Sequence, residues 1–276
     1  MPRIDAHQHF WQFDPVRDNW ITDDMEVLQQ DFLPDDLHPL LQVNDFDGCV
    51  VVQSDQSEKE DEFQLLNAEA FDFIRGIVGW VDLQAEDVED RLAYYHSFKK
   101  MKGFRHVLQG EADRALMLKP AFRNGISKLN KFHFTYDLLI HPDQVGYAAA
   151  LVQQFPDQRF VVDHLAKPFI KSGDITAWDA DIRKLAKFEN VSCKISGLVT
   201  EADWAHWKLE DFAPYLDVAL QAFGTKRVMF GSDWPVCQLA ASYEQVLEVV
   251  SAYFAGFTEH ERELFFGINA TKFYHL

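Results

Sequence analysis

RIDAHQHF, residues 3–10, has the composition of a buried β-strand whose carboxyl end carries two histidines. Seven further segments are also strand-like, and most of the set have an apolar centre and a polar carboxyl end, as expected for strands that are buried on both faces and carry function at one end. They are residues 46–55, 74–83, 101–108, 133–141, 159–168, 190–199 and 226–235. The sequence therefore predicts eight strands.

Stretches with helical periodicity separate these strands, for example EDEFQLLNAEAFDF before the third and YLDVALQAF before the eighth. This alternation within 276 residues favours a closed parallel barrel over an open doubly wound sheet, which seldom reaches eight strands at this length. We therefore expect an α/β fold, a distorted (β/α)8 barrel that forms one domain over residues 1–276. Residues 11–45 exceed a simple connection, and we expect them to form a loop and short helices over the barrel mouth.

Composition narrows the class of ligand. The chain has 44 acidic and 26 basic residues, a formal charge of −18 that repels nucleic acids and anionic membranes. No apolar stretch reaches the ~18 residues of a membrane span. The three cysteines lack CxxC spacing, which argues against a disulfide framework or a thiolate zinc site. We expect a cytoplasmic monomer or homodimer whose partner is a small neutral or singly charged molecule.

Asp5, His7 and His9 alternate along the first strand. Alternate side chains of a strand share a face, so both histidines are expected to point into the barrel mouth with Asp5 below them on the same side. This spacing suits two imidazoles that grip one metal ion or one carbonyl oxygen. Taken alone, the motif also fits one core histidine and one surface histidine.

Three further polar residues strengthen the functional interpretation. His141, His164 and Asp233 lie at or near the carboxyl ends of the fifth, sixth and eighth predicted strands. The active sites of (β/α)8 barrels lie at this end. The candidate catalytic set is therefore His7, His9, His141, His164 and Asp233.

This pattern resembles the amidohydrolase superfamily. The strings DAHQHFW, GWVDL, KGFRH, VDHLAKP, CKISGL and FGSDWPV are similar to the branch that contains sugar lactonases, such as L-fuconolactonase and L-rhamnonolactonase, and 2-pyrone-4,6-dicarboxylate lactonase. The resemblance extends from residue 3 to the C-terminus. It implies that His7, His9 and His141 surround the scissile carbonyl or a metal, that Asp233 handles the proton of the attacking water, and that His164 lines the pocket.

The chemistry of lactone opening suits these residue types. Hydrolysis places negative charge on the carbonyl oxygen, and each donor aimed at that oxygen lowers the barrier by ~3 kcal/mol in favourable cases. The attacking water must also lose a proton to a group within hydrogen-bond reach. Asp233 is the expected general base, and it then passes the proton to the ring oxygen of a small sugar-acid lactone.

Several cations and aromatic residues are candidate substrate contacts. Arg105, Lys194 and Lys167 would lie in or near the mouth, where each could bind substrate hydroxyls or a carboxylate, or else form an internal ion pair. Trp80 and Trp234 could stack on a sugar ring or pack in the core. For the remaining tryptophans, packing is the expected role.

The metal requirement is open at this stage. His7, His9, His141 and Asp233 are suitable zinc ligands in number and type. The bridging lysine or glutamate of two-metal members is missing, because the fourth strand offers Arg105 and the fifth offers only His141. The resemblance implies lactonases that work without a required metal. We therefore expect no required cofactor, with one divalent cation such as zinc as the alternative.

Two other functions are compatible with the same residues. Metal-dependent decarboxylases of the superfamily share this pattern of histidines and aspartate, and they would require a tightly held divalent ion. A barrel that binds sugar acids without turnover is less favoured, because no member of the polar set is missing.

Overall fold

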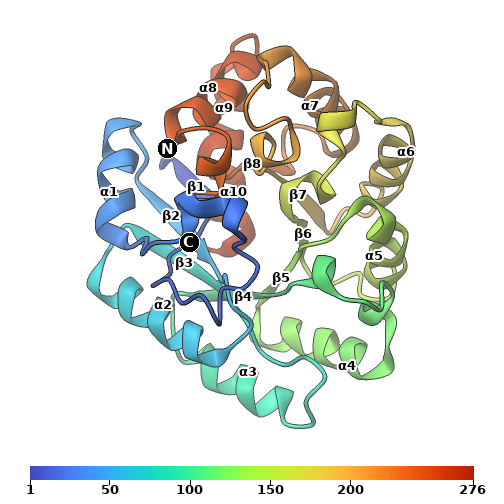
Figure 1. Ribbon diagram of the computed structural model, residues 1–276. Coiled ribbons are helices and arrows are strands. Elements are labelled where there is room, and N and C mark those ends of the chain that lie inside the picture. Colours follow the sequence, from blue (N-terminus) through green and yellow to red (C-terminus); the bar gives the residue numbers. More distant parts are fainter.

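A computed structural model describes residues 1–276 as one sheet of eight parallel strands in sequence order (Figure 1). The barrel closes at a parallel bridge between Gln8, at the end of the first strand, and Trp234, just beyond the last strand. A 2.8 Å hydrogen bond from the Asp233 N–H to the His7 carbonyl lies beside it. The predicted distorted (β/α)8 barrel is confirmed. The strands are β1 Ile4–Gln8, β2 Gly48–Val52, β3 Ile74–Gly79, β4 Met101–His106, β5 Thr135–Leu138, β6 Phe160–Val162, β7 Val191–Ile195 and β8 Val228–Phe230.

Ten α-helices alternate with or follow the strands, and Figure 1 shows most of them around the outside of the barrel. They are α1 Pro34–Val43, α2 Glu58–Ala70, α3 Val88–His96, α4 Pro120–Leu129, α5 Val145–Val152, α6 Thr176–Leu185, α7 Leu209–Phe223, α8 Tyr243–Phe254, α9 Glu259–Glu263 and α10 Asn269–Tyr274. None of these helices has both the length and the apolar character that crossing a bilayer requires. The three cysteines are free and buried.

Two apolar layers hold the barrel together. The larger, with 67 buried residues, lies mainly between the strands and the surrounding helices. The smaller fills the amino-terminal end of the barrel interior, where α10 packs against inward-facing strand residues. Its members are Ile4, Ala6, Val50, Val52, Val78, Val161, Met229, Ala270, Phe273 and Tyr274. The helix α10 therefore closes the end of the barrel opposite the predicted mouth.

An irregularity in β1 aims the site histidines. The pairing of β1 with β2 shifts register between Asp5 and Gln8. His7 faces the barrel interior, where its Nδ1 lies 3.1 Å from Lys194 Nζ on β7. Asp5 faces the helices instead, because its Oδ2 accepts a 3.2 Å hydrogen bond from the Tyr243 hydroxyl on α8. Bulges commonly re-aim a side chain at a barrel rim, and the expectation that Asp5 lies below the two histidines is wrong.

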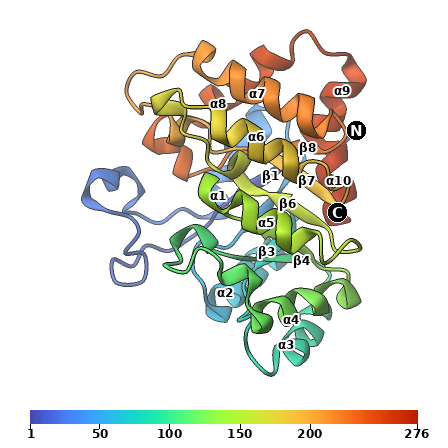
Figure 2. The same cartoon turned by 90° about the vertical axis from the view of Figure 1, so that its right-hand side faces the viewer.

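Residues 11–33 form the part of the first connection that covers the mouth. Figure 2 shows this blue segment extending beyond the barrel, at the end opposite the two chain termini. Its base is held by an antiparallel bridge between Trp11 and Phe32, and a short 3-10 helix spans Asp23–Leu28. The later part of the predicted cap, Pro34–Val43, is α1, the helix between β1 and β2.

Candidate active site

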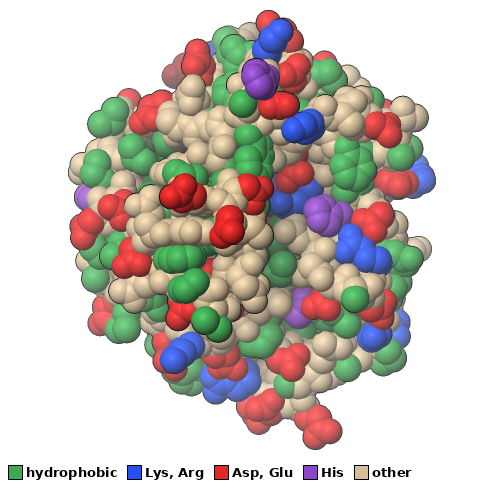
Figure 3. Space-filling view, in the orientation of Figure 1, with side chains coloured by type: hydrophobic (Ala, Val, Ile, Leu, Met, Phe, Trp, Pro, Cys, Tyr) green, Lys and Arg blue, Asp and Glu red, His purple; other side chains and the backbone are tan.

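A pocket of about 340 Å³ opens at the barrel mouth. Figure 3 views this face and shows basic, acidic and histidine side chains around a hollow near its centre. The volume lies at the lower end of the roughly 300–1,000 Å³ typical of small-molecule sites. The pocket is lined by His9, Arg17, Asn19, Trp20, Ser54, Asp55, Gln56, Arg105, Val107, Gln109, Leu139, His164, Lys167, Asp233 and Val236.

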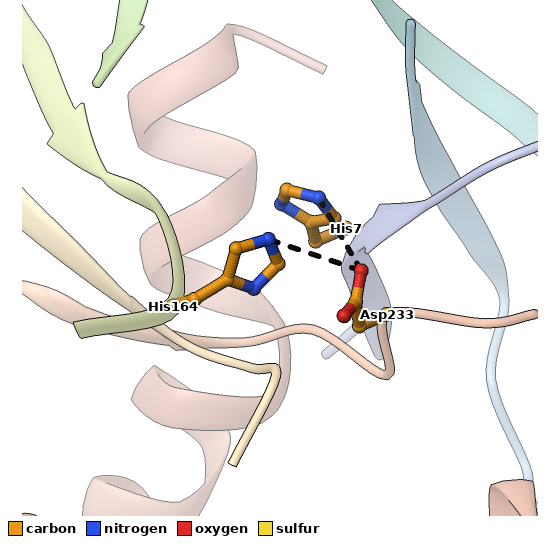
Figure 4. Close-up of side chains that lie close together, drawn as sticks. All are labelled: His7, His164 and Asp233. Carbon is orange, nitrogen blue, oxygen red and sulfur yellow. Dashed lines mark ion pairs between the residues drawn. The ribbon is translucent and has the colours of Figure 1, made fainter. Parts of the chain in front are cut away.

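Asp233 stands at the centre of the polar cluster on the pocket floor. Its Oδ1 lies 3.3 Å from His9 Nε2 and 3.8 Å from Nε2 of both His7 and His164. Figure 4 shows the imidazoles of His7 and His164 side by side, with this carboxylate facing both rings. His9, His164 and Asp233 reach the pocket, whereas His7 is 0% exposed and lies one layer deeper.

The segment after β6 takes an unusual backbone conformation that brings His164 and Lys167 to the pocket. The four residues His164–Lys167 all have φ between 52° and 58°. This left-handed region is unfavourable by roughly 1–2 kcal/mol for each residue other than glycine. Contacts with the surrounding structure must therefore stabilise the turn. Trp178 of α6 does so, because its Nε1 donates a 2.7 Å hydrogen bond to the Leu165 carbonyl.

Two glycines give the imidazoles their space. A Cβ at Gly197, just after β7, would lie 2.6 Å from His164 Nδ1, and the φ of Gly197 is +63°. A Cβ at Gly231, just after β8, would lie 2.5 Å from His7 Cβ. Real Cβ atoms do not tolerate such separations, so both rings pack directly against bare backbone.

Hydrogen bonds on the far side of each ring restrict its tautomer. His9 Nδ1 lies 2.7 Å from the Val52 carbonyl, which can only accept, so this nitrogen carries a proton. His164 Nδ1 faces the Ser196 hydroxyl at 2.9 Å. When that hydroxyl donates, the Nε2–H of His164 can donate into the pocket.

Burial disfavours charge on the imidazoles. It lowers the pKa of His164 to about 4, against a smaller opposing effect of Asp233. Burial and the Lys194 ammonium together lower the pKa of His7 well below its usual value. Burial raises the pKa of the Asp233 carboxyl, but the neighbouring imidazoles, His164 first, outweigh it and bring the pKa below its ordinary value. At neutral pH the floor therefore holds an ionised carboxylate beside uncharged His7 and His164.

A layer of buried charges lies beneath the cluster. Lys194 Nζ is 2.6 Å from Asp137 Oδ2 and 3.0 Å from Asp163 Oδ1, while Arg105 donates to Asp163 Oδ2 at 3.1 Å. All four side chains are at most 4% exposed. The sequence interpretation did not include Asp137 and Asp163. Each could have been identified in the sequence as a charged residue within an otherwise apolar predicted strand. The two strings are TYDLL, which contains Asp137, and VVDHL, which contains Asp163.

The predicted cationic contacts divide into two kinds. Arg105 and Lys167 line the pocket, although each also pairs with an acid, Asp163 and Glu201 respectively. Lys194 is 0% exposed and cannot touch a substrate in the pocket. For Lys194 the substrate-binding role is wrong, and the internal ion pair is what the structure shows.

The tryptophan that lines the pocket is not one of the two expected from the sequence. Trp234 is 1% exposed and packs edge-on against Phe10 and Phe32, so it cannot stack on a ligand. Trp80 is half-buried, donates to His106 Nδ1 at 3.3 Å, and is absent from the lining of the mouth pocket. The tryptophan in the lining is Trp20, which is 38% exposed and for which packing was expected.

The segment over the mouth supplies further lining residues that sequence reasoning missed. Arg17, Asn19 and Trp20 all come from residues 11–33. The excess length of this connection was the available signal. It predicted a segment over the mouth but not which side chains would turn inward.

His141 stands apart from the other four candidates. It lies three residues beyond the end of β5 and precedes the short helix Pro142–Gln144, whose N-cap it forms. The half-buried ring makes no hydrogen bond or ion pair with His7, His9, His164 or Asp233, and it does not line the pocket. The expected convergence of all five residues is thus limited to four.

The cluster also contains a possible metal-ligand set. One ligand atom each of His7, His164 and Asp233 lies within 4.8 Å of the others, and all three residues are buried. Imidazole and carboxylate are common zinc ligands. This set differs from the one expected from sequence, because His164 takes part while His9 and His141 do not.

Comparison with known proteins places the chain among close relatives. It is 39% identical to an L-fucono-1,5-lactonase of Burkholderia multivorans over 99% of this chain and 96% of the relative. It is 36% identical to an L-fucono-1,5-lactonase of Burkholderia ambifaria over 87% and 83%. A crystal structure of an amidohydrolase from Burkholderia multivorans with bound zinc superposes with a TM-score of 0.97 at 39% identity, over 100% of both chains.

The family model for amidohydrolases matches residues 4–276, nearly the whole chain. That range includes all eight strands, the four clustered side chains and α10. The protein is therefore a member of the amidohydrolase family.

Proposed function

We propose that the protein hydrolyses a small neutral sugar-acid lactone. The observation that carries this proposal is the ionised Asp233 carboxylate, set between imidazoles on the floor of a pocket of about 340 Å³. The two L-fucono-1,5-lactonases at 39% and 36% identity support an aldonolactone of similar size as the substrate.

In this mechanism Asp233 is the general base. Water attacks the lactone carbonyl carbon while its proton passes to Asp233, and negative charge develops on the carbonyl oxygen. Arg105 and the Nε2–H of His164 are the pocket donors placed to stabilise that oxygen. The ring C–O bond then breaks, and the leaving alkoxide takes the proton from Asp233. The product is a hydroxy acid, which loses a proton to water at neutral pH.

The charges of the pocket favour a neutral substrate over a dicarboxylate. Arg17 Nη2 lies 2.7 Å from Asp18 Oδ2, and Lys167 Nζ lies 3.0 Å from Glu201 Oε1. Arg105 is likewise paired, with Asp163. A substrate carboxylate would have to compete with these acids, whereas hydroxyl groups can use the remaining donors and acceptors. Trp20 offers an apolar ring face for the sugar.

A divalent cation fits the donor set but has unfavourable neighbours. Bound by His7, His164 and Asp233, an ion such as zinc would polarise a carbonyl and lower the pKa of a bound water. However, Lys194 Nζ and Arg105 Nη1 lie 3.1 and 3.3 Å from the two ring nitrogens of His7. Their positive charges oppose a further cation, so we propose that hydrolysis does not require one.

A hydrolysis screen tests the proposed function. Purified protein is mixed with L-fucono-1,5-lactone, other aldonolactones and a dicarboxylate lactone, and a pH indicator follows acid release. We expect faster acid release than in the uncatalysed reaction for neutral aldonolactones, and loss of that release in Asp233→Asn. Absence of hydrolysis with every lactone would refute the proposal. Carbon dioxide release from an aromatic acid would then favour a decarboxylase, and binding without turnover would favour a sugar-acid sensor.

A further inference from the structure

The loop after β2 forms the part of the pocket wall next to the proposed carbonyl-binding donors. Its residues Ser54–Gln56 all line the pocket. The two residues before them hold side chains of the floor. The Val52 carbonyl accepts a 2.7 Å hydrogen bond from His9 Nδ1, and the Gln53 carbonyl accepts one from Arg105 Nη2. In a pocket of about 340 Å³, a substrate whose carbonyl oxygen is bound by Arg105 therefore lies against this loop.

Hydrogen bonds hold this loop in one conformation. The Glu60 side chain accepts hydrogen bonds of 2.6 Å from the backbone N–H groups of Ser54 and Asp55. The Ser57 hydroxyl donates a 2.6 Å hydrogen bond to Asp55 Oδ2. Because the backbone and the Asp55 carboxylate are both fixed before a ligand arrives, little conformational entropy is lost when the loop binds one.

The side-chain amide of Gln56 has a defined orientation. Its Oε1 accepts a 2.7 Å hydrogen bond from the N–H of Val107, the residue after β4. A backbone N–H can only donate, so this contact turns the amide oxygen toward Val107 and leaves Nε2 on the other side. Gln56 Nε2 and Asp55 Oδ1 form no hydrogen bond with the protein, and Asp55 forms no ion pair. The loop thus offers the pocket one free donor group and one free acceptor on adjacent residues.

A hydroxyl group matches this pair of residues. It can donate its hydrogen to the Asp55 carboxylate and accept from the Gln56 amide at the same time. A ligand carboxylate would accept from Gln56 but would be repelled by Asp55. A ligand ammonium would donate to Asp55 but has no lone pair for Gln56. The donor and the acceptor together therefore favour a hydroxyl over either charged group.

We propose that Asp55 and Gln56 are specificity-determining residues that bind a ring hydroxyl of the substrate, which donates to Asp55 Oδ1 and accepts from Gln56 Nε2. This assignment rests on the proposed function, because it concerns the substrate of the same pocket. A site built to bind a hydroxyl discriminates strongly against an analogue that lacks it, because its polar groups then lose their contact with water and gain no partner. The pair therefore selects hydroxylated lactones over simple ones.

Two lactones that differ only in their hydroxyls test this role. L-Fucono-1,5-lactone carries ring hydroxyls, whereas δ-hexalactone has the same ring and methyl group without them. The readout is the ratio of kcat/KM for the two lactones. This preference should fall ~10- to 100-fold in Asp55→Ala, the scale of a hydrogen bond to a charged group. It should fall ~10-fold in Gln56→Glu, which keeps the acceptor for the Val107 N–H but removes the free donor.

Asp82→Ala is the matched control. Asp82 lies in the loop after β3, is exposed and does not line the pocket, and its Oδ1 accepts a 2.9 Å hydrogen bond from the Gln84 N–H. The variant removes the same charge as Asp55→Ala and should keep the wild-type ratio. General loosening of the pocket would lower kcat/KM for both lactones alike, so a changed ratio separates recognition of the hydroxyl from structural support.

The proposal is overturned if Gln56→Glu, or a folded Asp55→Ala, keeps the wild-type ratio. 1,5-Anhydro-L-fucitol separates this inference from the proposed function, because it has the hydroxylated ring but no carbonyl to attack. In calorimetric titrations both variants should bind it ~10-fold more weakly than wild type and Asp82→Ala. If wild type hydrolyses no lactone, the proposed function fails, and the titrations still decide whether the pair binds a hydroxyl. Equal affinity in wild type and the two variants, or no binding by wild type, refutes it.

Discussion

Asp233 combines a strained backbone with a buried charge. Its φ is 58°, in the left-handed region, and its N–H donates to the His7 carbonyl at 2.8 Å. That conformation turns the carboxylate toward His9 and His164 rather than along the strand. Strain of this kind persists only where surrounding contacts impose it, and it is common at active sites.

Asp233→Asn should lower kcat with little change in KM. The amide keeps the size of the side chain but cannot take up the proton of the attacking water. General-base catalysis contributes ~10²- to 10⁴-fold, which is the expected fall in kcat. Steady-state kinetics on the best lactone measure it. If the variant keeps most of its kcat, the proton goes elsewhere, and His164 becomes the next residue to test.

Trp20 should affect binding more than chemistry. The residue lies on the segment over the mouth and is 38% exposed in the pocket wall. Trp20→Ala removes a ring face from both the bound substrate and the transition state, so KM should rise ~10-fold while kcat changes little. Trp20→Phe should recover much of the loss. Unchanged KM in Trp20→Ala would show that the sugar does not contact this ring.

At the level of the elements, the loops that follow the strands hold the active-site side chains in place, because their backbone packs closely against those side chains. The segment after β6 is held in its left-handed turn by Trp178 of α6, and the glycines after β7 and β8 leave room for His164 and His7. The loop after β2 is held by α2. Glu60 of α2 accepts hydrogen bonds of 2.6 Å from the backbone N–H groups of Ser54 and Asp55, both in the pocket lining.

Gly197→Ala should damage both stability and turnover. The new methyl group would lie 2.6 Å from His164 Nδ1 at a φ of +63°. A catalytic group displaced by about 1 Å can lose ~10²-fold in rate, and we expect a fall of that order in kcat. Gly146→Ala is the control, because Gly146 is exposed on α5 with open space around it, and alanine should stabilise the helix by ~1 kcal/mol. Wild-type kcat in Gly197→Ala would contradict the packing argument.

Glu60 should make stability depend on pH. Burial raises its pKa from 4.5 to about 7, against the opposing hydrogen bonds from Ser54 and Asp55. The folded protein therefore holds a proton that the unfolded chain has lost between these values. The stabilising contribution is full below pH 4.5 and declines as the pH rises through 7, by up to about 3 kcal/mol at roughly 1.4 kcal/mol per pKa unit.

Urea unfolding of wild type and Glu60→Gln at pH 5 and pH 8 measures this contribution. Glutamine cannot ionise, so the free energy of unfolding of wild type should fall more between the two values than that of the variant. Parallel pH dependence of the two proteins would show that Glu60 does not carry the effect.

For the molecule as a whole, the sequence predicted the architecture and most of the pocket floor. Apolar segments with polar carboxyl ends were sufficient to predict a parallel barrel. In a parallel barrel His9, His164 and Asp233 come to the same end. Side-chain direction was less predictable. Lys194 is buried because Asp137 on β5 and Asp163 just after β6 neutralise it. His141 lies outside the cluster because the chain turns away beyond β5. Such features depend on contacts between segments that are distant in the sequence. The pattern of apolar and polar residues along one strand does not predict these contacts.

Chelation tests the electrostatics of the whole site. Lys194 and Arg105 place two positive charges beside His7, and we expect lactone turnover to survive exhaustive treatment with a chelator. The crystal structure of the amidohydrolase from Burkholderia multivorans contains bound zinc, which makes the metal requirement worth measuring. Measured zinc content and kcat before and after chelation decide the question. If turnover disappears and zinc alone restores it, His7, His164 and Asp233 are metal ligands and the hydrogen-bond mechanism is wrong.

The closure of the barrel by α10 has a consequence for biosynthesis. Domains generally begin to fold while the chain is still being synthesised. Here Asn269–Tyr274 follow all eight strands in the chain, and they provide both the apolar plug and the Tyr274 hydroxyl beside Asp137. While they remain inside the ribosome, the nascent chain can pair its strands but lacks the floor beneath Lys194. The charged layer under the active site is therefore completed only after every strand has been synthesised, and a message truncated before codon 269 yields a barrel open at its base.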